Sequence, residues 1–302
     1  MKYIILTILV CSSITLCNAQ KLRNDFSYTQ KTEYSEQVVF RSRKDTTVNR
    51  YEKIVINGFN SKVPFYHYIN KDNKNKFVFL LHDLDSSNDD WLKPRSDGKL
   101  VDSLVTLGYN VIIPDAKYHG ERSYEFNFRP AGILPPELSK SQKDSESLVE
   151  IYSSTIKDIR IIMDYFENHY SSENVQFDLI GYSMGGAMSL IVNAVDARIN
   201  SIASCVPPVN RPIKEIKDYG WPNEITESLK DISPIYYANF QISPVALLMG
   251  KTDYFTSEEE ATKFFDGILD DDKHLKFYEA GHGLPAEYIN DVINWITTHN
   301  KK

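Results

Sequence analysis

The sequence predicts an α/β fold in which a mostly parallel sheet carries helices on both faces. Three observations lead to this fold class: short apolar segments recur along the chain, amphipathic segments of helical length separate them, and a strand-turn-strand pattern precedes them. Short apolar strands that alternate with helices form a mostly parallel sheet covered on both faces. The predicted strands are 77–81, 109–114, 175–180, 199–206, 244–249 and 275–278, and the predicted helices are 91–107, 148–166, 183–195, 258–269 and 285–298.

The first element of the fold is a predicted hairpin. The strand-like segments 53–56 and 63–69 flank the sequence NGFN at 57–60, which is typical of a turn. Further along, residues 148–166 place apolar side chains three and four positions apart, so one apolar stripe runs along a helix. Residues 20–50 are polar and show little periodicity, so we expect an extended arm that enters an edge strand.

Composition indicates a single globular domain. The chain has 302 residues, of which 42% are hydrophobic and 25% are charged, as in packed globular proteins. It contains no internal repeat and no low-complexity linker, so we expect one α/β domain over residues 51–302, after the arm at 20–50. The net charge is -7, and no basic cluster is interleaved with aromatic residues. This pattern argues against nucleic acid as a partner.

Residues 1–19 predict a removable signal peptide for export. A positively charged start and an apolar run are followed by small residues up to Ala19, as signal peptidase requires. An uncleaved anchor and a lipid-modified Cys17 are the alternatives, and no other segment approaches the length of a membrane span. Cleavage leaves Cys205 as the one cysteine, so we expect a buried strand thiol there and no intrachain disulfide.

The most specific functional motif is the sequence GYSMGG at residues 181–186. It follows the apolar strand 177–180 directly and precedes a helix directly, which is the context of a G-x-S-x-G nucleophile elbow. Glycine at the first and fifth positions removes β-carbons that would clash in this sharp turn. The helix after it directs N–H groups toward the site. A glycine turn that binds phosphate is the alternative, but the flanking strand and helix favour Ser183 as a nucleophile.

A serine nucleophile needs a base and an acid that orients the base, in the chain order serine, acid, histidine. Of the three histidines after Ser183, His282 lies in a glycine-flanked loop between a strand and a helix, which predicts it as the base. Asp253 directly follows the preceding predicted strand, which predicts it as the acid. Asp231 precedes its strand, and residues 270–272 end a helix as a solvated turn, so both are weaker candidates.

An oxyanion hole should combine two backbone N–H groups, one from the residue after the nucleophile and one from the loop after an earlier strand. Met184 supplies the first group. Leu84, in the loop that follows the strand 77–81, is our candidate for the second. The histidines form neither an H-E-x-x-H motif nor a close group with cysteine, so we expect no metal and no other cofactor.

Five sequence features occur in a fixed order along the chain: the His82-Asp83 loop, the segment PDAKYHGERS at 114–123, the elbow, the sequence GKTD at 250–253 and the sequence GHG at 281–283. On these features, the chain resembles the α/β-hydrolase superfamily from about residue 77 to the C-terminus. Within it, the chain is similar to the serine aminopeptidase-like and dienelactone hydrolase-like esterases. The resemblance implies an eight-stranded sheet with one antiparallel strand near its start.

Asp83 is where the chain departs from this family, which usually has glycine after the histidine. A carboxylate aimed at the oxyanion would repel the charge that forms there. We therefore expect the Asp83 side chain to point out of the hole and to accept the N–H groups of Ser86 and Ser87. His119 and Arg122 are expected to brace this region rather than to catalyse.

Together these residues predict an exported serine hydrolase that cleaves carboxylic esters of small acyl groups. Ser183 would attack the acyl carbon, His282 would transfer the proton and Asp253 would orient His282. The alternatives are a serine peptidase or aminopeptidase-like amidase and a noncatalytic binding protein on the same fold. Two proline-bearing segments, 124–143 and 207–231, would either form a short lid or cap the sheet edge. The second segment is brief and polar, so it cannot build a deep apolar tunnel.

Overall fold

A computed structural model describes residues 21–30, 34–41, 51–70, 75–84, 86–92, 96–128, 142–170, 175–211 and 227–300. The strands are β1 (Glu36–Arg41), β2 (Tyr51–Asn57), β3 (Lys62–Tyr68), β4 (Lys76–Leu81), β5 (Asn110–Pro114), β6 (Gln176–Tyr182), β7 (Ile199–Cys205), β8 (Val245–Gly250) and β9 (Lys273–Tyr278). The α-helices are α1 (Ser96–Thr106), α3 (Gln142–His169), α4 (Met184–Val195), α7 (Glu258–Asp266) and α8 (Tyr288–His299). The 3-10 helices are η1 (Asn88–Leu92), η2 (Gly120–Phe126), η3 (Ser228–Ile232) and η4 (Pro234–Phe240).

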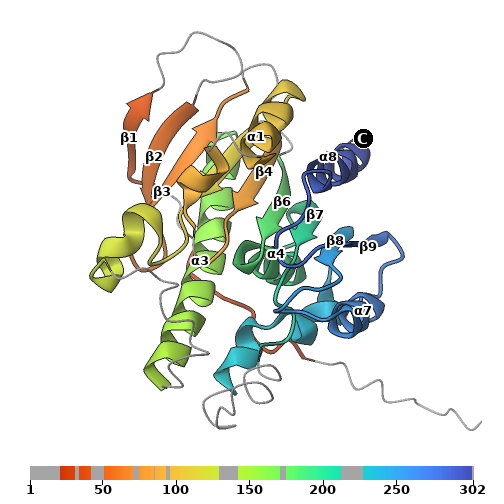
Figure 1. The fold of residues 1–302 in the computed structure, drawn as a ribbon. Helices are drawn as coiled ribbons and strands as arrows, with labels where there is room; N and C mark the ends of the chain where they lie inside the picture. Colours follow the sequence, from red (N-terminus) through yellow and green to blue (C-terminus); the bar gives the residue numbers. More distant parts are fainter. Residues whose placement is uncertain are drawn as a thin grey trace, which may run out of the picture.

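The described strands form one sheet in the order β1-β2-β3-β5-β4-β6-β7-β8-β9 (Figure 1). Neighbouring strands from β5 to β9 are parallel, whereas the pairs β1–β2, β2–β3 and β3–β5 are antiparallel. The predicted hairpin is present as β2 and β3. The predicted fold class is confirmed, but the described part of the chain contributes nine strands instead of eight. The additional strand is β1, which comes from the expected arm and pairs with β2 at the sheet edge.

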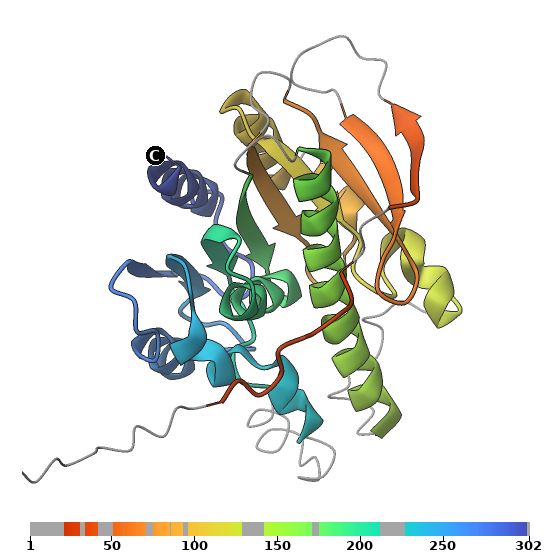
Figure 2. The ribbon, with the colours of Figure 1, turned by 180° about the vertical axis from the view of Figure 1, so that it is seen from behind.

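Helices cover both faces of the sheet. Consecutive residues of a strand point to opposite faces, and in β6 Leu179 belongs to one core whereas Ile180 belongs to the other. The helices α3, α4 and α7 pack on the first face, and α1 and α8 pack on the second. Figure 2 shows the long helix α3 lying in front of the sheet when the molecule is seen from behind. The inner parallel strands β4, β5, β6, β7 and β8 are thus mostly buried, whereas the edge strand β9 stays partly exposed.

The apolar stripe predicted for residues 148–166 is buried along α3. Ile151, Ile159 and Phe166 are each at most 3% exposed and pack in the core beneath this helix. The helix has 28 residues and begins at Gln142, six positions before the predicted start. The first turns are polar, so they lack the apolar periodicity on which the prediction depends.

Several predictions concern residues outside the described part of the chain. The expected signal segment 1–19 lies there, as do residues 129–141 and 212–226 of the two proline-bearing segments. Export, the domain boundaries and the lid therefore stay predictions. Of the helices that the described residues form, none combines the length and the apolar character needed to cross a membrane. Cys205 ends β7 and is buried, as expected for a strand thiol.

Candidate active site

Ser183 lies in the sharp turn between β6 and α4, with backbone angles φ 50° and ψ −113°. A positive φ is unusual for a residue other than glycine and is typical of a strained functional turn. The turn requires two close approaches of backbone. A β-carbon on Gly181 would come within 2.1 Å of the Gly185 carbonyl oxygen, and one on Gly185 would come within 2.1 Å of the Leu81 carbonyl oxygen. The G-x-S-x-G spacing is therefore a packing requirement of this turn.

The structure brings the three predicted residues Ser183, Asp253 and His282 together from three loops. His282 Nε2 lies 2.8 Å from Ser183 Oγ, and His282 Nδ1 lies 2.9 Å from Asp253 Oδ2. A carboxylate accepts only, so His282 donates its Nδ1–H to Asp253 and leaves Nε2 as an acceptor for the serine proton. This is the geometry in which an imidazole acts as a general base.

The Asp253 carboxylate is itself held in place by backbone donors. Oδ1 accepts the Phe255 N–H at 2.7 Å and the Thr256 N–H at 3.4 Å, and the side chain has no exposed surface. The Thr256 hydroxyl donates to the Pro207 carbonyl at 2.8 Å, which ties this turn to the loop after β7. Both carboxylate oxygens therefore have fixed partners, and the side chain presents one orientation to His282.

The two residues predicted for the oxyanion hole lie at the same end of the sheet. Met184 is the first residue of α4, so its N–H has no acceptor within the helix. Leu84 follows β4, and the peptide before it is oriented by His82, whose Nδ1 lies 2.7 Å from the Asp83 carbonyl oxygen. The Ala116 N–H donates to Nε2 of His82 at 3.0 Å, so the ring must carry its proton on Nδ1. Burial also lowers the pKa of His82, which keeps the ring neutral.

This contact fixes the direction of the Leu84 N–H. The described residues contain no cis peptide bond. In a trans peptide the carbonyl oxygen and the amide hydrogen point in opposite directions. Because the Asp83 carbonyl points toward His82, the Leu84 N–H points away from His82. The arrangement supports Leu84 as the second donor of an oxyanion hole.

One detail expected for Asp83 is wrong. The Ser86 N–H donates to the main-chain carbonyl of Asp83 at 3.4 Å, and the Ser87 N–H donates to the Asp90 carboxylate at 2.9 Å. The Asp90 carboxylate thus accepts one of the two N–H groups that were assigned to the Asp83 side chain. No sequence motif marks Asp90 for this contact. The loop is still closed by local hydrogen bonds, but through a different carboxylate.

His119 braces this loop, as expected. Its Nε2 lies 2.7 Å from the Leu84 carbonyl oxygen and its Nδ1 lies 2.7 Å from the Lys117 carbonyl oxygen. Burial lowers the pKa of His119 to about 4, so the neutral ring donates to one carbonyl at a time.

Burial also raises the pKa of the neighbouring Asp115 carboxyl to about 7, although this side chain accepts the Asn88 N–H. Sequence reasoning missed Asp115.

Arg122 is fully buried and likewise has structural partners. Its guanidinium donates to the carboxylates of Glu125 and Asp158, each at 2.9 Å, and to the Ser61 hydroxyl at 3.0 Å. A buried charge needs this degree of pairing to be tolerated. The network connects η2 with the β2–β3 hairpin and α3, and these hydrogen bonds do not involve Ser183. The arrangement agrees with a bracing role.

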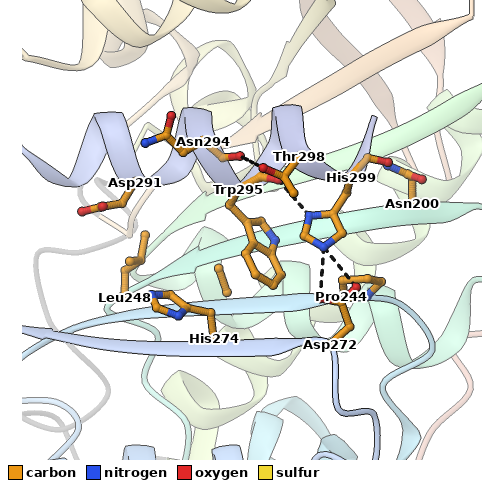
Figure 3. Close-up of a pocket in the computed structure, with 11 residues that line it drawn as sticks. Asn200, Pro244, Leu248, Asp272, His274, Asp291, Asn294, Trp295, Thr298 and His299 are labelled. Atoms are coloured by element: carbon orange, nitrogen blue, oxygen red, sulfur yellow. Dashed lines mark hydrogen bonds and ion pairs between the residues drawn. The ribbon is translucent and has the colours of Figure 1, made fainter. Parts of the chain in front are cut away.

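A groove of about 690 Å³ lies elsewhere, between α8 and the strands β8 and β9 (Figure 3). It contains the two remaining histidines that follow Ser183, namely His274 and His299. His299 donates to the Trp295 carbonyl at 2.8 Å and pairs with Asp272 at 3.1 Å, so both ring nitrogens have partners among the residues of this groove. No member of the triad lines this groove. Within the described residues, no group of three or more His, Cys, Asp and Glu side chains could hold a metal ion.

A mostly parallel sheet, a serine elbow after a central strand, and an acid and a histidine after later strands define the class of protein: an α/β-hydrolase. The family comparison is more specific. The model of the dienelactone hydrolase family matches residues 63–294, and the chain belongs to this family. Because this is a family of ester hydrolases, we classify the chain as an ester hydrolase.

Relatives and solved structures agree with this classification. The chain is 23% identical over 265 residues to "Putative esterase YitV" of Bacillus subtilis, which covers 79% of this chain and 96% of the relative. The fold is similar to that of acetyl xylan esterase 1 from Thermoanaerobacterium sp., with a TM-score of 0.66, 16% identity and 88% of each chain covered. A Pyrococcus furiosus esterase matches with a TM-score of 0.61 and 19% identity, covering 87% of this chain and 97% of the other. At these identities the solved structures show the fold.

Proposed function

We propose that the chain is an exported serine esterase that hydrolyses esters of small acyl groups. The observation that carries the proposal is the continuous series of hydrogen bonds from Asp253 through His282 to Ser183, at 2.9 and 2.8 Å. A chance contact would not place the buried carboxylate, the imidazole and the elbow serine in line. Family membership favours an ester over an amide as the substrate.

The proposed reaction has two halves. Ser183 Oγ attacks the acyl carbon while its proton moves to His282 Nε2, and the oxyanion receives the N–H groups of Leu84 and Met184. Collapse of the tetrahedral intermediate breaks the ester bond, and the leaving alkoxide takes the proton from His282. A water molecule then gives one proton to His282 and attacks the acyl carbon of the acyl-enzyme. Collapse of this second intermediate breaks the bond to Ser183 Oγ, which takes the proton from His282, so that the acid is released and the hydroxyl is restored.

The proposal of a small acyl group has two supports. The proline-bearing segment 207–231 is short and polar, with Tyr219 and Trp221 as its main large apolar side chains. Each acyl methylene left in water forgoes about 0.8 kcal/mol of burial, so long chains gain little from such a site. In addition, one of the similar folds is named an acetyl xylan esterase.

The experiment uses the mature chain from Gln20, a fluorophosphonate probe and a panel of substrates. Covalent labelling that disappears in Ser183→Ala, together with turnover of acetyl and propionyl esters, would support the proposal. A steady rise in kcat/KM from acetyl to decanoyl esters would contradict the small-acyl assignment. Faster cleavage of aminoacyl amides than of esters would favour the peptidase alternative. A folded wild-type chain that is not labelled would favour a noncatalytic binding protein.

Export has its own test. The sequence carries the predicted signal at 1–19, so expression of residues 1–302 should yield a product outside the cytoplasm. N-terminal sequencing of that product should begin at Gln20. A product that retains residues 1–19, or that carries lipid on Cys17, would contradict cleavage after Ala19.

A further inference from the structure

The catalytic base lies on a loop whose own sequence gives it little rigidity. His282 is flanked by Gly281 and Gly283, between the end of β9 and the start of α8. Neither glycine is required by space: a β-carbon on Gly281 would meet its nearest neighbour at 3.6 Å, and one on Gly283 would meet nothing within 4 Å. Glycine loses more conformational freedom on folding than any other residue. The position of His282 therefore needs restraints from outside the loop.

The N-terminal side of the loop is attached to the end of β8. The Thr252 N–H donates to the Ala280 carbonyl at 3.0 Å, and the Lys251 N–H donates to the Tyr278 carbonyl at 2.9 Å. These bonds end before His282. They hold the entry to the loop and leave the peptide groups of the histidine itself to another partner.

That partner is the hydroxyl of Tyr182. It donates to the His282 carbonyl at 2.7 Å and accepts the Leu284 N–H at 2.9 Å. The two bonds lie on either side of Gly283, so one hydroxyl group closes the flexible part of the loop. The Tyr182 ring also meets the His282 ring edge to face, with centroids 6.2 Å apart.

Tyr182 is the last residue of β6 and directly precedes Ser183. Its hydroxyl thus connects the loop of the base to the residue next to the nucleophile, across 100 positions of sequence. The contact of His282 Nδ1 with Asp253 fixes the imidazole ring, whereas the Tyr182 contact fixes the main chain that carries the ring. The two contacts therefore act on different parts of the same residue, one on the ring and one on the main chain.

We infer that Tyr182 is a positioning residue for the base, whose hydroxyl holds the main chain of His282 at the distance that proton transfer from Ser183 requires. The inference rests on the proposed esterase function. It assigns a specific task to the second position of the G-x-S-x-G motif in this chain. Tyr182 itself touches neither the serine proton nor the oxyanion in this arrangement, so its effect passes through His282.

The test compares Tyr182→Phe with Tyr278→Phe. The first variant keeps the ring and its packing but removes both hydrogen bonds to the loop. The second removes a hydroxyl that donates to the Asp291 carboxylate at 2.5 Å, and so loosens β9 against α8 without touching His282. It is a matched control because it changes the two elements that flank the same loop.

Turnover is measured per active site, with sites counted by fluorophosphonate titration. A displacement of about 1 Å can cost about 100-fold in rate, so kcat per titrated site of Tyr182→Phe should fall about 10- to 100-fold while KM changes little. Tyr278→Phe should keep the wild-type kcat per site. A merely structural role for Tyr182 would lower the melting temperature or the fraction of active sites and leave kcat per site unchanged.

A second measurement does not depend on activity. In ¹H–¹⁵N spectra of histidine-labelled protein, wild-type His282 should give one set of imidazole signals with the proton on Nδ1. Tyr182→Phe should broaden or average these signals, and Tyr278→Phe should not. Unchanged His282 signals and unchanged kcat per site in Tyr182→Phe would overturn the inference. A wild-type chain that shows the ordered imidazole but hydrolyses no ester would instead contradict the proposed function.

Discussion

Replacement of Asp253 by asparagine tests the chemistry of the site most directly, because the structure determines how the new side chain must lie. Oδ1 of Asp253 accepts the backbone N–H groups of Phe255 and Thr256. An asparagine has to keep its oxygen there, since an NH₂ group in that place would face two donors. Its NH₂ group then faces His282 Nδ1. The imidazole can accept that donor only if its own proton moves to Nε2, so Ser183 Oγ meets an N–H in place of a base.

The expected loss follows from this exchange of tautomers. A wrong tautomer in a serine triad costs about 10⁴ in kcat, which corresponds to about 5 kcal/mol of activation free energy. Solvent offers no substitute, because the side chain of Asp253 has no exposed surface. The residue contacts the base and not the substrate in the proposed reaction, so KM should stay within a few-fold of the wild-type value. The fold should be retained, since the two side chains have the same shape.

The assay is steady-state hydrolysis of an acetyl ester by the wild type, Asp253→Asn and Asp272→Asn. Asp272 is a matched control because its carboxylate also pairs with a histidine, His299, in the groove beneath α8. We expect the control to keep near-native kcat. Near-native turnover by Asp253→Asn would refute the assignment of the acid, and an equal loss in both variants would point to general destabilisation.

Three further predictions concern the elbow and the core. Ser183→Ala should abolish turnover and fluorophosphonate labelling while the melting temperature stays near that of the wild type; residual labelling would point to another nucleophile. Gly185→Ala should lower the free energy of unfolding, measured in urea, by about 3 kcal/mol, because the new β-carbon would lie 2.1 Å from the Leu81 carbonyl oxygen. Gly283→Ala is the control and should lower it far less, because its β-carbon would have no neighbour within 4 Å. Burial lowers the pKa of His67 from 6.5 to about 4. As the pH falls through this range, the imidazole is protonated in the unfolded chain but not in the folded one, so the free energy of unfolding decreases between pH 6.5 and pH 4. Between pH 7 and pH 5, the free energy of unfolding in urea should therefore decrease by about 2 kcal/mol less in His67→Phe than in the wild type. An identical decrease in both proteins would contradict a neutral buried imidazole.

The sequence predicted the parts of this molecule that local patterns determine. The elbow is one example: a strand, two glycines and a helix in succession admit only a tight turn, so the place of Ser183 follows from neighbouring residues. Asp253 and His282 could be selected because parallel strands bring their carboxyl ends to one edge of the sheet. An edge strand was expected at the end of the arm, but the bounds of β1 were not predicted, since residues 20–50 show little apolar periodicity.

The contacts that hold the site in place could not be read from local patterns. Tyr182 and His282 lie 100 positions apart, and a tyrosine at the second position of the elbow has no signature that predicts a hydroxyl contact to the base loop. Asp115 is similar, because its burial and raised pKa arise from the packing of η1 and η2 around it. Such positioning groups depend on tertiary structure, whereas reacting groups are constrained by chemistry to a few residue types.

The loop after β4 shows the same difference at Asp83. A sequence comparison treats the residue type at this position as the determinant of the oxyanion hole, so a carboxylate in place of glycine looks harmful. In the structure, the direction of the next N–H depends on the main-chain carbonyl of Asp83, which accepts the proton on His82 Nδ1, and the Ala116 N–H fixes that tautomer. Any L-residue that keeps this carbonyl in place presents the Leu84 N–H in the same direction. The determining residue of this loop is therefore His82. A side chain at position 82 that could not donate to the carbonyl of residue 83 would release the peptide plane between residues 83 and 84, regardless of the residue type at position 83.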